Sequence, residues 1–108
     1  MNRFEKRIFR AVSECKPYRD RLVQIQALNG NIEVFFHDTL VFQKNRLFIK
    51  AAIDGYSVRF ICSIINTCFK AVGVNVSLSF RHNMPRFRYN GVEYTRNSLM
   101  LPSYDKES

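Results

Sequence analysis

The stretch that decides the fold is VQIQALNGNIEVFF, residues 23–36. Apolar and polar residues alternate on both sides of Asn29-Gly30, a dipeptide that accepts the positive φ angles of a tight hairpin turn. We therefore expect two antiparallel strands joined at this turn. A helix over residues 19–28 is the competing interpretation, because periodicity alone does not always separate the two structures in short apolar runs.

Further strands are expected on both sides of the middle of the chain. Residues 40–43 and 46–50 form a second pair, which extends the hairpin to a meander of four antiparallel strands. Asn90-Gly91 marks another hairpin turn, between strands at residues 86–89 and 92–96. A strand over residues 76–81 precedes this hairpin and could pair with it.

Two helices are expected from the 3.6-residue period. The first covers residues 2–15, with Ile8 and Val12 on its apolar side and basic residues on the other, and Pro17 ends it. The second begins at Asp54 or Ser57 as N-cap and ends at Gly73 as C-terminal cap. Its apolar residues occupy a wide arc, which predicts a buried central helix.

These elements predict a single α+β domain over residues 1–101, because 108 residues suit one hydrophobic core. It consists of an N-terminal amphipathic helix, an antiparallel meander of about four strands, a central buried helix and a C-terminal β-hairpin. Residues 102–108 are polar, and we expect a flexible tail there. Neither a membrane span nor a secretory signal is recognisable, so we expect a cytoplasmic protein without a membrane partner.

The charge is strongly basic and uneven. Seventeen Lys and Arg face nine Asp and Glu, for a formal net charge of +8. Residues 1–22 contain seven Lys and Arg against three acidic residues, and residues 81–96 contain four Arg against one Glu. Such an excess attracts polyanions and gives a salt-sensitive affinity for nucleic acid, although acidic proteins can use it too.

Arginine is suited to phosphate because its planar guanidinium donates two hydrogen bonds at once. Strand alternation places Arg86 and Arg88 on one face of the last hairpin, opposite Phe87 and Tyr89. The alternative is that these arginines only keep an edge strand from aggregating. The candidate nucleic-acid-binding residues, which we expect to form one common patch, are Arg3, Lys6, Arg7, Arg10, Arg81, Arg86, Arg88 and Arg96.

Phe35 and Phe48 are candidate stacking residues, since both lie on the outward side of the predicted meander among charged residues. Exposed aromatic rings between basic side chains are how single-stranded nucleic acid is held. The favoured alternative is that the N-terminal helix covers both rings, because this would bury two apolar surfaces at once.

Nothing in the spacing of reactive residues indicates catalysis. His37 and His82 are not paired with a nucleophile, and the three cysteines lack the spacing of a zinc site. The glycines are explained by turns and caps, so a phosphate-binding loop is not indicated. We therefore expect a protein that is not an enzyme and has no metal or cofactor.

The layout of residues 22–95, a hairpin followed by a helix and the Asn90-Gly91 hairpin, loosely resembles small uncharacterised bacteriophage proteins. This resemblance implies a viral accessory protein acting in the host cytoplasm. Our hypothesis is a non-enzymatic protein that binds DNA or RNA through phosphate contacts, with little sequence specificity. The alternative is an inhibitor or adaptor that docks its basic face on an acidic host protein, and a self-associating structural component is a third hypothesis.

Overall fold

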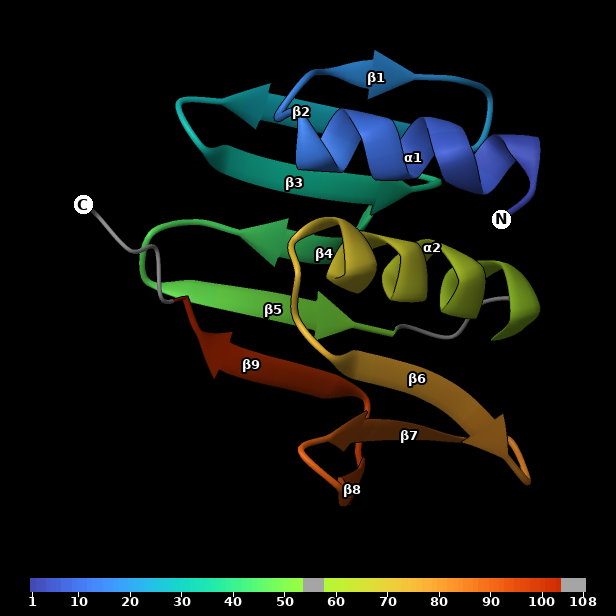
Figure 1. Cartoon of the computed structure of the whole chain (residues 1–108). Helices are drawn as coiled ribbons and strands as arrows, with labels where there is room; N and C mark the ends of the chain where they lie inside the picture. Colours follow the sequence, from blue (N-terminus) through green and yellow to red (C-terminus); the bar gives the residue numbers. More distant parts are fainter. Residues whose placement is uncertain (54–57, 104–108) are drawn as a thin grey trace.

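The computed structural model describes residues 1–53 and 58–103, and it confirms the α+β fold. The two helices are α1 (Arg3–Ser13) and α2 (Val58–Ala71). The strands are β1 (Tyr18–Arg19), β2 (Val23–Leu28), β3 (Asn31–Phe36), β4 (Thr39–Lys44), β5 (Phe48–Ala52), β6 (Val76–Arg81), β7 (Met84–Tyr89), β8 (Val92–Thr95) and β9 (Ser98–Pro102). Both helices lie on one face of a large sheet, and a small sheet lies beyond α2 (Figure 1).

The predicted central hairpin is confirmed. β2 and β3 pair antiparallel, and the turn between them places Asn29 at φ 53° and Gly30 at φ 82°. These positive angles belong to the turn type whose twist matches that of the flanking strands, which is why the Asn-Gly dipeptide favours a hairpin. The competing helix over residues 19–28 is therefore excluded.

The meander is longer than four strands, because the large sheet has the order β1-β2-β3-β4-β5-β9. We predicted neither edge strand. β1 is only two residues long, and β9 pairs with β5 from a position late in the chain. Pro102, which we expected at the start of the tail, lies opposite Phe48, and the Ser103 amide donates to the Leu47 carbonyl at 3.1 Å. Residues 104–108 lie outside the described part of the chain.

α1 begins at a capping box in which the Asn2 side chain and Glu5 each accept a hydrogen bond from the other's backbone amide. Its apolar side buries Ile8, Ala11 and Val12, as predicted. Glu5, which interrupts that side, accepts a hydrogen bond at 2.7 Å from the Ser63 hydroxyl of α2. The one polar residue on the apolar side thus helps to join the two helices.

The expectation that α1 covers Phe35 and Phe48 is wrong. α1 and α2 cover the opposite face of the large sheet, where Val23, Ile25 and Val34 are almost completely buried. We call the other side the open face. Its residues include Arg19, Gln24, Gln26, Leu28, Glu33, Phe35, Leu40, Gln43, Phe48, Lys50 and Met100. A helix packed on the open face would bury side-chain amides and a carboxylate without hydrogen-bond partners. The free-energy penalty of this burial is larger than that of leaving two aromatic rings partly exposed.

α2 is the predicted central helix, and its buried residues include Ile61, Ile64, Ile65 and Phe69 at 0% exposure. Gly73, at φ 75°, follows the helix as the expected C-terminal glycine. The predicted N-caps lie in residues 54–57, outside the described residues. Within residues 1–53 and 58–103, neither helix is long and apolar enough to cross a membrane.

The small sheet has the order β6-β7-β8 and includes the predicted Asn90-Gly91 hairpin. Its inner side adds Val76, Leu78 and Phe87 to the same hydrophobic core that the large sheet shares. Asn66 of α2 joins the helix to β6, because its side chain accepts from the Leu78 amide at 2.6 Å and donates to the Leu78 carbonyl at 2.9 Å. This pair satisfies backbone groups at the edge of the small sheet.

Candidate nucleic-acid interface

The exposed side of α1 is basic. Arg3, Lys6, Arg7 and Arg10 are all exposed, whereas Ile8 on the other side is fully buried. The separation follows from the helical period, which returns residues three and four positions apart to the same side. The four α1 candidates from the sequence are therefore brought together on one surface.

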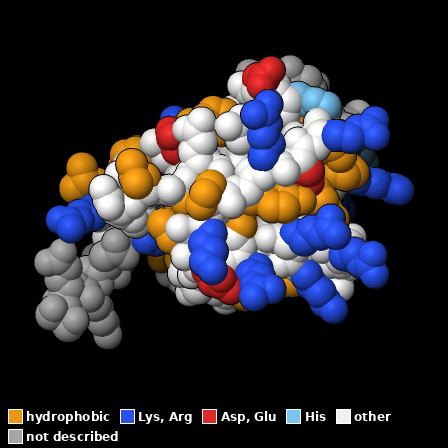
Figure 2. Space-filling model, turned by 90° about the horizontal axis from the view of Figure 1, so that it is seen from above, with side chains coloured by type: hydrophobic (Ala, Val, Ile, Leu, Met, Phe, Trp, Pro, Cys, Tyr) orange, Lys and Arg blue, Asp and Glu red, His pale blue; other side chains and the backbone are white. Residues whose placement is uncertain are grey.

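The segment after α1 adds three more cations to this surface. The Lys16 amide donates to the Ala11 carbonyl at 2.8 Å, and β1 then pairs with β2, so the chain runs back beside the helix. Lys16, Arg19 and Arg21 are exposed. We call the surface of α1 and residues 16–21 the basic end. Seen from above in Figure 2, Lys and Arg side chains crowd one side of the molecule, where α1 and β1 lie.

A hollow of about 350 Å³ lies between α1 and β1 within the basic end. Its lining is Arg7, Arg10, Ala11, Glu14, Lys16, Pro17 and Tyr18. Three cationic side chains from two segments therefore border one depression. Guanidinium and ammonium groups donate hydrogen bonds to phosphate oxygens, but Glu14 in the same lining already pairs with Arg10 and Lys16.

The acidic residues of the basic end are engaged in local contacts. Glu14 pairs with Arg10 and Lys16, each at 3.1 Å, and both cations lower the pKa of Glu14 below its usual value. Glu5 is bonded to Ser63 and Asn2, which lowers its pKa as well. Among the described residues, Arg3, Lys6, Arg19 and Arg21 have no acidic partner, so their charge is available to a ligand.

Asp20, the third acid, holds the turn between β1 and β2. Its carboxylate accepts hydrogen bonds from the Leu22 and Val23 amides, both at 2.8 Å, and from the Tyr18 hydroxyl at 2.6 Å. Burial raises the pKa of Asp20, but these hydrogen bonds outweigh burial and its pKa is lowered. Burial and the Asp20 carboxylate raise the pKa of Tyr18, against the opposing effect of Arg7. Asp20 therefore has a structural role at the basic end.

The small sheet carries the second basic cluster. β7 places Arg86 and Arg88 opposite Ser79 and Ser77 of β6, and Arg81 shares their side, as predicted. Arg86 is paired with Glu93 of β8 at 3.3 Å. Arg96 lies elsewhere. Its guanidinium carbon is 5.0 Å from the centre of the Tyr94 ring, and Tyr94 lies opposite Phe87 on the other face.

The two basic clusters do not form the common patch that the sequence led us to expect. α1 lies at one end of the layer that covers the large sheet, the small sheet lies at the other end, and α2 separates them (Figure 1). Lys16, Arg19 and Arg21 belong to the uneven charge seen in the sequence, but we did not predict them as site residues. Their closeness to Pro17, which turns the chain back along α1, was the available signal.

Phe35 and Phe48 both lie half-buried on the open face but are not neighbours. Glu33, Gln43 and Lys50 are aligned across three strands, which places Phe35 two residues to one side of this row and Phe48 two residues to the other. Four residues of strand correspond to about 13 Å along the sheet. The two rings therefore cannot stack on the same base.

The cysteines form no disulfide or metal site in the described residues. Cys15, Cys62 and Cys68 are free thiols, and no group of three His, Cys, Asp or Glu side chains within the described ranges could hold a metal ion. Burial raises the pKa of Cys62 to about 11 and that of Cys68 further. Both are therefore thiols rather than thiolates near neutral pH.

Comparison with known proteins gives no match: no family model, no curated protein and no solved structure resembles this chain significantly. The resemblance to bacteriophage accessory proteins stays a prediction. The surface itself therefore provides the observations that bear on function.

Proposed function

We propose that this protein binds nucleic acid without catalysis, mainly through backbone phosphates at the basic end, and with little sequence preference. The observation that carries the proposal is the convergence of seven exposed cations from two segments, with all three acids of that end already engaged. They are Arg3, Lys6, Arg7, Arg10, Lys16, Arg19 and Arg21. The small sheet contributes less, because the pairing of Arg86 and the separate position of Arg96 leave it two arginines, whereas four cations of the basic end have no acidic partner among the described residues.

Phosphate contact explains the arrangement better than base recognition. The cations are spread over the exposed side of a helix and a connecting segment. Each cationic group lies at the end of a long, flexible side chain that can adjust to the phosphate backbone of a nucleic acid. Contacts of this kind position a protein on nucleic acid but do not read its sequence. They also release counterions, so the affinity falls as salt is added.

The test compares two double variants that each remove two positive charges, with a fluorescent oligonucleotide titrated at several salt concentrations. Arg3→Ala with Arg21→Ala should weaken binding and reduce the slope of log affinity against log salt by about 1.4 for a single strand and about 1.8 for a duplex. The matched control is Arg81→Ala with Arg88→Ala, which should leave the slope within about 0.5 of the parent value.

Failure to bind at about 50 mM salt, where phosphate contacts are strong, would refute the proposal. The adaptor alternative would then be favoured if an acidic host protein were retained by the purified chain after nuclease treatment. An equal loss of slope in both double variants would also contradict the assignment of binding to the basic end.

A further inference from the structure

We propose that the nucleic acid is single-stranded, and that one unpaired base stacks on Phe35 while Arg19 and Arg21 contact the neighbouring phosphates. This inference rests on the proposed function and names the class of ligand. It concerns the border between the basic end and the open face, where an aromatic ring and unpaired cations meet.

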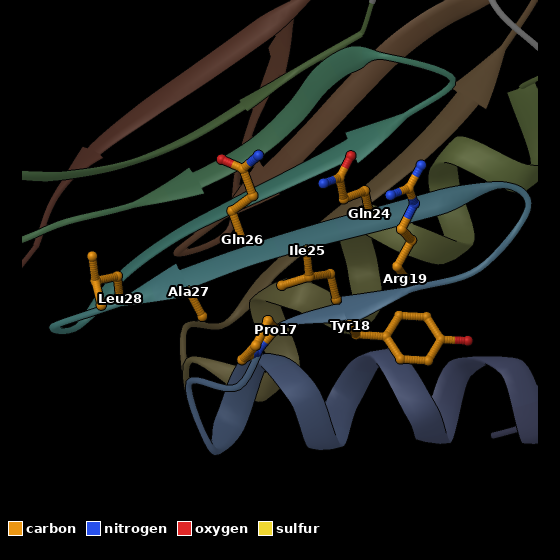
Figure 3. Close-up of a pocket in the computed structure, with 8 residues that line it drawn as sticks. All are labelled: Pro17, Tyr18, Arg19, Gln24, Ile25, Gln26, Ala27 and Leu28. Carbon is orange, nitrogen blue, oxygen red and sulfur yellow. The ribbon is translucent and has the colours of Figure 1, made fainter.

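Strand register creates the border. Arg19 lies opposite Gln24, Gln24 opposite Phe35, and Phe35 opposite Leu40, so these residues form one row across four strands. Residues paired in register share a face of a sheet. Figure 3 shows the first two members directly, since Arg19 and Gln24 project to the same side of the strand pair, away from α1.

A hollow of about 150 Å³ lies beside the Arg19, Gln24 and Phe35 part of this row. Phe35 and Gln24 border it together with both cations of the proposal. The full lining is Arg19, Asp20, Arg21, Leu22, Val23, Gln24, Phe35, His37 and Asp38. Phe35 therefore borders the same hollow as groups that attract phosphate, and the Gln24 amide can donate to and accept from a base edge.

The presence of an aromatic side chain favours a single strand over a duplex. Bases of a duplex are stacked on each other and expose only their edges, whereas an unpaired base can place its face on an aromatic ring. Charge complementarity favours nucleic acid over an apolar partner, because Arg19 and Arg21 have no acidic partner among the described residues. Phe48 does not border this hollow, because it lies opposite Pro102 at the far end of the open face, with Lys50 as its nearest cation on the same strand and face.

Two carboxylates also face the hollow, and they have different consequences. The Asp20 carboxylate is occupied by the Leu22 and Val23 amides and by Tyr18, so it is partly neutralised by its donors. Asp38, in the turn after β3, has no bond to a described residue and would repel a phosphate. Asp38→Asn should therefore strengthen binding of a single strand about two-fold or more.

The experiment compares a labelled oligothymidylate with a duplex of the same length at about 100 mM salt. We expect the single strand to bind at least about five-fold more tightly, and Phe35→Leu to reduce its affinity about five-fold or more while duplex affinity changes little. Phe48→Leu, on the same face, is the matched control and should leave both affinities unchanged. Equal binding of both ligands, together with no effect of Phe35→Leu, would overturn this inference and leave the proposed function intact.

A second measurement does not depend on the stability of Phe35→Leu. The chain contains no tryptophan, so Phe35→Trp introduces a single indole at the proposed stacking position. Its fluorescence should be quenched when oligothymidylate is added, and the fluorescence of Phe48→Trp should not. Binding without quenching at position 35, or equal quenching at both positions, would overturn the inference, whereas absence of any binding would refute the proposed function.

Discussion

The basic end and the small sheet have similar shares of the net charge but different surfaces. At the basic end the cations come from a helix and the segment that returns beside it, and the acids are bonded to the protein. In the small sheet the arginines alternate along strands, one is paired with Glu93, and another packs on Tyr94. The disposition of charges, and not their number in the sequence, therefore decides which surface has cations without acidic partners.

The strongest loss of stability is expected at the junction between α2 and the small sheet. Asn66→Ala removes both hydrogen bonds to Leu78 and should lower the free energy of unfolding by about 2 kcal/mol or more. Urea unfolding measures this loss. Nucleic-acid affinity should stay within about two-fold of the parent below the unfolding midpoint, since the basic end is untouched.

Asn75→Ala is the matched control, because this asparagine is exposed and precedes β6. It should change stability by less than about 0.5 kcal/mol. If Asn66→Ala were no less stable than Asn75→Ala, the attachment of the small sheet through Asn66 would be disproved.

An intermediate effect concerns acid sensitivity at the basic end. The pKa of Glu5 is lowered from its ordinary 4.5 by its hydrogen bonds to Ser63 and Asn2. A lowered pKa in the folded state contributes stability that is present above the unfolded-state value and lost as pH falls through the folded-state value. The urea concentration at the unfolding midpoint of the parent should therefore decrease as the pH is lowered below about 4.5. Glu5→Gln should make this decrease smaller.

The measurement for Glu5 is a set of urea titrations between neutral pH and about pH 3. Glutamine retains the ability to cap α1, so the variant isolates the titration of the carboxylate. An identical pH dependence of the parent and Glu5→Gln would show that Glu5 does not join the two helices as described.

The smallest expected effect concerns the ion pair of the small sheet. Glu93→Gln releases Arg86 but should change the free energy of unfolding by less than about 1 kcal/mol, because the pair is partly exposed. If the small sheet does not hold nucleic acid, releasing Arg86 should also leave affinity within about two-fold. A several-fold gain in a binding titration would instead assign part of the interface to the small sheet.

Local signals in the sequence predicted most of the elements. The Asn29-Gly30 and Asn90-Gly91 turns determine their own hairpins, and the helical period determined both helices, because these features depend on neighbouring residues. β1 was missed because two residues carry no period, and β9 because it pairs with β5, far back in the chain. Such edge strands depend on contacts that a local pattern does not contain.

The site was predicted only in part, for a related reason. The basic side of α1 follows from its period, but the distance between α1 and the small sheet depends on how α2 packs between them. The sequence contained enough information to predict which face of the large sheet the helices cover. Gln24, Gln26 and Glu33 share the face of Phe35, so covering that ring would have buried three polar side chains.

Whether nucleic acid binds at the basic end can be determined by NMR, with backbone amide shifts recorded as oligothymidylate is added at about 50 mM salt. We predict that the shift changes concentrate in α1, in residues 16–24 and around Phe35, while β6, β7 and β8 remain almost unchanged. Changes concentrated in β6, β7 and β8, with α1 unaffected, would contradict the account.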